Sequence, residues 1–153
     1  MIVKIKKLSD EAFMPTKATE GSAAYDLYAP CDVLVRPGRQ VIDMKFAIEL
    51  PLGYEAKIEP RSGYSCKGFA GAAASDMEPD MQFDCDVLTG KVDSDFRNSI
   101  GVIVCNRDRQ FFIRRGQRIA QLTIYSVGVA DFVEAEELTE TERGMGGFGS
   151  TGK

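Results

Sequence analysis

Short apolar runs separated by proline and glycine dominate the chain, and their spacing predicts β-strands. Residues 2–5 combine isoleucine and valine with lysine in a short strand-like run. Two longer runs, 41–50 and 54–58, are separated by Pro51-Leu52-Gly53, a sequence typical of a turn. Further strands are expected at residues 25–28, 32–35, 99–105, 111–113 and 118–125.

Helical periodicity is almost absent. Only residues 134–138 have a pattern that would allow a turn or two of helix. Closely spaced short strands with so little helix predict an all-β sandwich or barrel. The 153 residues contain no internal repeat and no linker, so we expect one domain, which at this length buries about 70% of the surface exposed by the unfolded chain.

The charge balance and the N-terminus narrow the class of protein. The net charge is −4, and no block of basic residues suggests a nucleic-acid partner. No apolar run approaches the length of a membrane span, and residues 1–4 do not resemble a signal peptide. We therefore expect a cytoplasmic protein with neither a nucleic-acid nor a membrane partner.

Cysteine and histidine usage limits the chemistry. The sequence has no C-x-x-C spacing, so its cysteines are expected to be buried apolar residues rather than disulfides or zinc ligands. The absence of histidine excludes a histidine base, a Ser-His-Asp or Cys-His site and histidine metal ligands. General acid–base catalysis must therefore use carboxylates, and a bound metal should be a hard ion such as Mg²⁺. The four cysteines are Cys31, Cys66, Cys85 and Cys105.

The stretch 143–152 combines five glycines with Arg143, Phe148, Ser150 and Thr151. Glycine lets successive backbone N–H groups converge on an anion, and arginine presents a planar fork to phosphate oxygens. Phe148 offers a face on which a base can stack. The stretch indicates an arm that closes over a nucleotide polyphosphate, with a flexible glycine-rich tail as the alternative.

Four internal stretches contain further polar residues at the ends of predicted strands. Residues 18–27 place Asp26 among small residues, 59–63 present an arginine and a serine, 90–97 pair Asp93 with Asp95, and 115–122 join a glycine turn to an apolar strand. Each stretch alone is compatible with a plain polar turn. Two acids at i and i+2 of a strand share one face, where their charges affect each other.

Together, these five stretches closely resemble the motifs of the trimeric dUTP pyrophosphatases (dUTPases). The matching text includes "PRSG", "VDSDF", "GQRIAQL" and "RGMGGFGSTG". The resemblance implies a jelly-roll-like β-barrel, a homotrimer and a C-terminal arm exchanged between subunits. It divides the chain into a barrel domain, 1–142, with an acidic insertion at about 70–86, and a mobile glycine-rich arm, 143–153.

The same resemblance implies hydrolysis of dUTP to dUMP and pyrophosphate by water attack on the α-phosphorus, with Mg²⁺ as cofactor. Such an activity limits uracil incorporation into DNA and supplies dUMP for thymidylate synthesis. Asp93 would be the general base, and Asp26 would hold the metal through water. The implied substrate-binding residues are Arg61, Ser62, Gly63, Val87, Gly90, Val92, Phe96, Gln121, Arg143, Phe148, Gly149, Ser150 and Thr151.

Two departures from the family pattern leave alternatives open. Phe96 stands where the family usually has tyrosine, and it keeps the ring that packs beneath the deoxyribose. The acidic insertion is the larger departure, and Val87 takes the place of the asparagine that reads uracil. A carboxylate in the pocket would suit cytosine, whereas a surface hairpin would leave uracil selection intact. A related enzyme acting on dCTP and a non-catalytic regulatory protein of the same fold are the competing functions.

Overall fold

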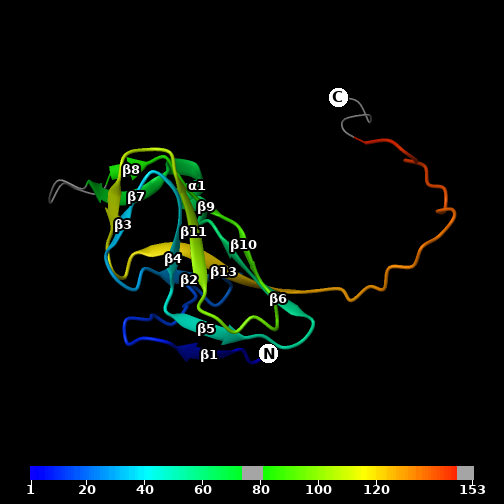
Figure 1. Ribbon diagram of the computed structural model, residues 1–153, viewed down its shortest axis with the longest axis horizontal. Coiled ribbons are helices and arrows are strands. Elements are labelled where there is room, and N and C mark those ends of the chain that lie inside the picture. The colour runs from blue at the N-terminus through cyan, green and yellow to red at the C-terminus, as the bar shows by residue number, and fades with distance from the viewer. Residues whose placement is uncertain (74–80, 148–153) are drawn as a thin grey trace.

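Thirteen strands and one short helix build the body of the protein in the computed structural model, which describes residues 1–73 and 81–147 (Figure 1). Every strand pairing among these residues is antiparallel. The prediction of an all-β fold is therefore confirmed. The strands are β1 (Lys4–Lys7), β2 (Tyr25–Tyr28), β3 (Val33–Val35), β4 (Gly38–Asp43), β5 (Phe46–Glu49), β6 (Tyr54–Glu59), β7 (Phe69–Ala73), β8 (Met81–Phe83), β9 (Cys85–Leu88), β10 (Gly90–Val92), β11 (Gly101–Asn106), β12 (Phe111–Ile113) and β13 (Arg118–Ser126).

The strands form four sheets around one core, in a jelly-roll-like arrangement. The strand orders are β10-β6-β13-β2, β4-β11-β9, β3-β12-β7-β8 and β1-β5. Alternation along the strands places one side of each sheet in the core. In β11, for example, Val102, Val104 and Asn106 are buried while the residues between them are partly exposed.

The segment expected to be an acidic insertion contributes to the core at both of its ends. Strands β7 and β8 pair with each other, and the Phe83 ring stacks on Phe111 with centroids 4.3 Å apart. Phe83, Cys85 and Ala72 are all buried. Residues 74–80 lie outside the described part of the chain. The described ends of this segment are therefore part of the sheet framework.

The helix α1 (Ser62–Lys67) was not predicted, and the turn of helix expected at residues 134–138 is wrong. The sequence Ser-Gly-Tyr-Ser-Cys-Lys of α1 has no apolar periodicity, so no pattern could reveal it. The helix ends at Gly68, whose N–H donates to the carbonyl of Tyr64 at 2.9 Å and whose φ is +84°. Residues 134–138 contact no surface that would stabilise them, and a short isolated helix is marginal in water.

The chain leaves the body after β13 and runs outward as an extended segment, orange in Figure 1. Residues 127–145 are all exposed. This extended part begins well before residue 143, where the sequence placed the start of the arm. Five of its large apolar side chains are almost fully exposed: Val129, Phe132, Val133, Leu138 and Met145.

The cysteines follow the prediction only in part. All four are free thiols. Cys85 is buried, and burial raises the pKa of its thiol to about 12, which keeps it protonated and inert. Cys66, on α1, is exposed, contrary to the expectation of burial. The described residues contain no helix long and apolar enough to cross a membrane.

Candidate functional site

Asp26 is buried in β2 and is bound by two arginines. Its side chain is only 5% exposed. Arg61 donates from Nε to one carboxylate oxygen at 3.2 Å, and Arg118 donates to the other at 3.3 Å. A buried carboxylate needs such partners because the loss of hydration is otherwise too costly. Asp26 therefore fixes two guanidinium groups at one end of the sheet.

Strand register brings the predicted phosphate-binding residues to that same end. Gln121 in β13 pairs with Asp26 on one side and with Glu59 on the other. Residues that lie opposite each other in antiparallel strands point to the same face. Arg61 and Ser62 follow β6 directly, at the start of α1. The structure thus groups Asp26, Arg61, Ser62 and Gln121, as the sequence motifs predicted.

An arginine-lined cavity of about 380 Å³ lies beside this group. The hydroxyl of Tyr64 donates to the carbonyl of Arg118 at 2.7 Å and accepts from the Gln117 side chain at 3.2 Å. The sequence motifs assigned no site role to Tyr64 or to the arginines at 114, 115 and 118, although the Arg-Arg-Gly-Gln-Arg run was a visible signal. Four guanidinium groups here suit a multiply charged anion. The lining residues are Arg61, Tyr64, Ala70, Arg114, Arg115, Gly116, Gln117 and Arg118.

Asp93 lies at the other end of the same sheet. It follows β10, whose last residue, Val92, pairs with Ala56. Val92 is buried and Asp93 is exposed, so the Asp93 side chain points away from the core. Continued by one position, the ladder would set Asp93 opposite Glu55, four residues from Glu59. At about 3.3 Å per residue, Asp93 is roughly 13 Å along the strand from the Gln121 row. One chain alone therefore does not bring this predicted base to its predicted phosphate-binding group.

The segment expected to read the base presents mainly its backbone. The side chains of Val87 and Val92 are buried, so a nucleotide can meet only main-chain atoms there. Strands β9 and β10 are separated by one residue, Thr89, but they pair with different sheets. Strands β9 and β10 therefore do not form a hairpin with each other. Phe96, in contrast, presents a ring that is 42% exposed.

The acids closest to this segment are held by an arginine. Arg107 donates to Asp84 at 2.9 Å and to Asp86 at 2.7 Å. These contacts, first with Asp86 and then with Asp84, raise the pKa of the Arg107 guanidinium. The carboxylates of Asp84 and Asp86 thus have a partner at the protein surface. This arrangement favours a surface location for the acidic segment over a role in binding cytosine.

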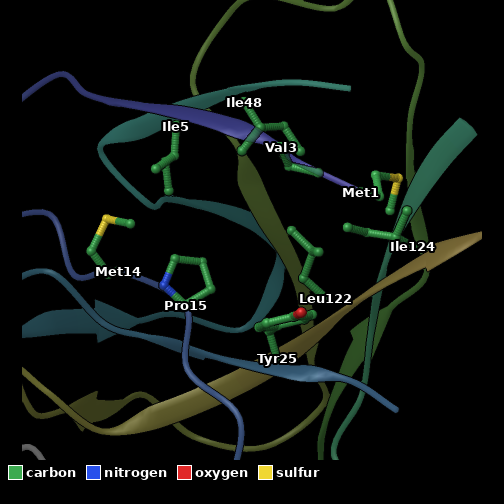
Figure 2. Close-up of a pocket in the computed structure, with 9 residues that line it drawn as sticks. All are labelled: Met1, Val3, Ile5, Met14, Pro15, Tyr25, Ile48, Leu122 and Ile124. Atoms are coloured by element: carbon green, nitrogen blue, oxygen red, sulfur yellow. The ribbon is translucent and has the colours of Figure 1, made fainter. Parts of the chain in front are cut away.

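A second, apolar pocket of about 220 Å³ lies between the N-terminal strand and the sheet that carries Asp26. Figure 2 shows Val3, Ile5 and Ile48 on one side of it and Leu122 and Ile124, from β13, on another. No motif or pattern in the sequence predicted this pocket. Its full lining is Met1, Val3, Ile5, Met14, Pro15, Tyr25, Ile48, Leu122 and Ile124.

Asp26 is the residue that the sequence motifs associate with Mg²⁺. Among the described residues, no three acids or cysteines are grouped as metal ligands. Asp26 is a single carboxylate, and both of its oxygens already accept from arginine. Such a residue fits an outer-sphere contact through water with an ion that is carried mainly by nucleotide phosphates.

The predicted arm residues are only partly visible. Arg143 donates from Nε to the carbonyl of Gly146 at 2.8 Å, within an exposed turn. Phe148, Gly149, Ser150 and Thr151 lie outside the described residues. In the single chain, the described part of the C-terminal segment extends away from the strands and the helix of the body (Figure 1).

The fold and the arginine-lined site define an all-β protein equipped to bind a multiply charged anion. The chain belongs to the dUTPase family, whose model matches residues 10–152. It is 41% identical over 155 residues to the deoxyuridine 5'-triphosphate nucleotidohydrolase of Nautilia profundicola, with 100% of each chain covered. It is 40% identical over 151 residues to the Arabidopsis thaliana enzyme of the same name, covering 97% of this chain and 82% of that protein.

Similarity to solved structures agrees with this assignment. The dUTPase of Staphylococcus bacteriophage 80alpha, solved with dUPNHPP, superposes with a TM-score of 0.83 at 25% identity. The match covers 99% of each chain. A dUTPase from phage phi11 of S. aureus shares the fold at 21% identity, with a TM-score of 0.75, and is described with a structural Mg(II) ion.

Proposed function

We propose that this protein hydrolyses dUTP to dUMP and pyrophosphate by attack of water on the α-phosphorus. The observation that carries the proposal is the group at the end of the sheet, in which Asp26 fixes Arg61 and Arg118 beside Ser62 and Gln121. Its support is the family membership, the nucleotidohydrolase names of the relatives and the dUTP analogue bound by the phage protein. Nothing in these comparisons favours the dCTP-acting or the non-catalytic alternative.

The residues divide the work between phosphate binding and water activation. Arg61, Ser62 and Gln121 hold the triphosphate, and Asp93 accepts the proton of the attacking water. Phosphoryl chemistry needs charge neutralisation and positioning above all, which arginines provide. The backbone at Val87, Gly90 and Val92 reads the base, and the exposed Phe96 ring packs beneath the deoxyribose. Asp26 would hold Mg²⁺ through water, and the ion, bound with the nucleotide, would supply further charge neutralisation.

The separation of Asp93 from the phosphate-binding group favours a site shared between copies of the chain. A general base must reach its proton directly or through one water. The roughly 13 Å between the Asp93 and Gln121 rows is too long for that within one chain. A homotrimer in which Asp93 of one copy faces Arg61 and Gln121 of the next satisfies this requirement.

The extended C-terminal segment supplies the link between copies. Val129, Phe132 and Val133 are 85% exposed or more, which is unfavourable unless another surface covers them. The apolar pocket of Figure 2 matches them in chemistry, so residues 127–142 of one copy pack on the pocket of its neighbour. The arm from Arg143 onward then closes over the γ-phosphate with Arg143, Gly149, Ser150 and Thr151, while Phe148 stacks on the base. Closure excludes bulk water during the reaction.

In the cell, this activity limits uracil incorporation into DNA and supplies dUMP, and we place the protein in the cytoplasm. The test is pyrophosphate release from dUTP, dCTP, dTTP and UTP, with and without Mg²⁺, alongside the mass of the assembly by light scattering. We expect turnover of dUTP far above the other nucleotides, stimulation by Mg²⁺ and the mass of three chains. Preferred release from dCTP would support the related enzyme, and no release from any nucleotide would support the regulatory alternative.

A further inference from the structure

Tyr64 attaches the helix α1 to the rest of the protein. The helix has no buried residue of its own. The Tyr64 ring is half-buried against the core and stacks on Phe69, with ring centroids 4.2 Å apart. Its hydroxyl donates to the carbonyl of Arg118, the first residue of β13, at 2.7 Å. The position of α1 against β13 therefore depends largely on this side chain.

Gln117, in the turn before β13, reinforces this attachment. Its side-chain amide donates to the Tyr64 hydroxyl at 3.2 Å and to the carbonyl of Ala70, in β7, at 2.6 Å. Its amide oxygen accepts from the main-chain N–H of Arg114 at 3.2 Å. The Tyr64 hydroxyl thus has both an acceptor and a donor as partners, and the hydrogen bonds connect α1 with β7 and with the turn before β13.

Tyr64 also contacts both of the arginines that bind Asp26. The guanidinium carbon of Arg61 lies over the Tyr64 ring, 5.5 Å from its centroid, within the range of a cation–π contact. The Tyr64 hydroxyl binds the main chain of Arg118. The contacts therefore form a closed circuit: Asp26 joins the two arginines through their side chains, and Tyr64 joins them a second time.

The second connection matters because arginine side chains are long and lose rotamer freedom when they are fixed in place. The side chains of Arg61 and Arg118 are 24% and 48% exposed, so packing alone does not fix them. Tyr64 restrains Arg61 at its guanidinium and Arg118 at its backbone. Charged groups that are already in place bind an anion without the cost of ordering them at that moment.

We infer that Tyr64 is a positioning residue for the phosphate site: it fixes the spacing between the guanidinium groups of Arg61 and Arg118. The inference rests on the proposed hydrolysis of dUTP for its functional meaning, although the positioning itself concerns any multiply charged anion bound by the two arginines. Tyr64 acts through the arginines and need not touch the nucleotide. Loss of its hydroxyl should therefore weaken anion binding without removing any charge from the site.

The test compares Tyr64→Phe, which removes only the hydroxyl, with Tyr64→Leu, which also removes the ring. Tyr28→Phe is the matched control, because the Tyr28 hydroxyl forms a hydrogen bond with Thr16 and Tyr28 does not line the arginine-lined cavity. Inorganic pyrophosphate is the probe, titrated calorimetrically into nucleotide-free protein. Its Kd should rise about threefold to fivefold in Tyr64→Phe, the effect of one net hydrogen bond, and further in Tyr64→Leu. The control should keep the wild-type Kd even where its melting temperature falls.

Two further measurements separate positioning from a general loss of stability. The Nε proton of Arg61 is donated to Asp26, so its exchange with water, followed by ¹⁵N NMR, should become faster in both Tyr64 variants and stay unchanged in Tyr28→Phe. In turnover of dUTP, Tyr64→Phe should raise KM by about the same factor as the pyrophosphate Kd and leave kcat nearly unchanged, as expected for the loss of uniform binding.

An unchanged pyrophosphate Kd in Tyr64→Phe, or an equal rise in Tyr28→Phe, would overturn the inference. A wild-type protein that binds no pyrophosphate would overturn it as well, because the two arginines would then hold no anion. Absence of dUTP turnover in a wild type that does bind pyrophosphate would instead overturn the proposed function, while the calorimetric comparison would still decide the role of Tyr64.

Discussion

Asp26 and Asp93 lie on the outer face of one sheet but in different electrostatic surroundings. Asp26 is buried and has an arginine on each oxygen, whereas Asp93 is exposed at the end of β10 beside a lysine. A carboxylate occupied by two guanidinium groups is a poor proton acceptor for substrate chemistry. This difference supports a structural and metal-associated role for Asp26 and leaves Asp93 as the group free to act as a base.

Replacing Asp93 with asparagine should abolish hydrolysis and leave nucleotide binding largely intact. Asparagine keeps the shape of the side chain but cannot accept a proton, and loss of a general base costs about 10²–10⁴-fold in rate. Single-turnover pyrophosphate release and calorimetric binding of dUpNHpp measure the two effects. Asp95→Asn is the matched control, because Asp95 is also exposed and lies two residues further on. Turnover near the wild-type rate in Asp93→Asn would remove this residue from the mechanism.

Replacing both Asp84 and Asp86 with asparagine should change the preference for dUTP over dCTP little. Arg107 already holds both carboxylates at the surface, so neither is available to face a base. The measurement is kcat/KM for both nucleotides in the wild type and the double variant. The ratio is expected to move by less than tenfold, or about 1.4 kcal/mol. A larger change, or a wild-type protein that prefers dCTP, would place these carboxylates in the pocket.

At the scale of secondary-structure elements, Gly68 determines where the short helix α1 ends. Gly68 has a φ of +84°, and a Cβ at this position would lie 2.7 Å from the carbonyl oxygen of Phe83. The helix must end there for β7 to pair with β8. Because α1 begins with Ser62 and Gly63, directly after Arg61, its geometry also holds part of the proposed phosphate site in place.

Gly68→Ala should therefore lower the free energy of unfolding by about 1–3 kcal/mol, since both the positive φ and the clash with backbone are unfavourable for a side chain. Gly63→Ala is the matched control, because a Cβ there meets nothing within 4 Å and alanine favours a helix. Urea unfolding at one fixed protein concentration, with the assembly state checked, gives both values. Equal free energies of unfolding for the two variants would show that the backbone around residue 68 relaxes without loss of stability.

At the scale of the whole molecule, the extended C-terminal segment has two parts with different predicted tasks. Residues 127–142 contain the exposed Val129, Phe132, Val133 and Leu138, whereas the stretch from Arg143 onward is dominated by glycine. The first part is suited to packing on a neighbouring copy, and the second to closing over a nucleotide. Of these two parts, only the first is therefore expected to contribute to the proposed trimer.

Truncation before Arg143 should leave a folded trimer that barely hydrolyses dUTP, because only closure over the substrate is lost. Truncation before Val127 should in addition weaken or abolish the trimer, because the apolar side chains that cover the pocket of the neighbour are removed. Light scattering over a range of protein concentrations and thermal unfolding without nucleotide compare the two. A large loss of stability or of the trimer in the shorter truncation would contradict this division.

The sequence by itself determined the fold class and the identity of the site motifs. Period-2 alternation and turn residues are local properties, so the all-β fold could be read without a structure. The five motifs predicted Asp26, Arg61, Ser62, Asp93 and Gln121 as site residues. The dependence on local patterns also explains why the two helix predictions were wrong. The helix α1 has no periodic signal, and residues 134–138 have a local pattern with no surface on which to form a helix.

Only the tertiary structure decided which of these residues meet. Strand register placed Asp26 beside Gln121 and set Asp93 near the far end of the same sheet, and register depends on contacts between strands distant in the sequence. The arginine cluster, the partners of Asp84 and Asp86 and the contact between Tyr64 and Arg118 arise in the same way. A spacing along the chain specifies which face a side chain takes, but the pairing of strands specifies its neighbours.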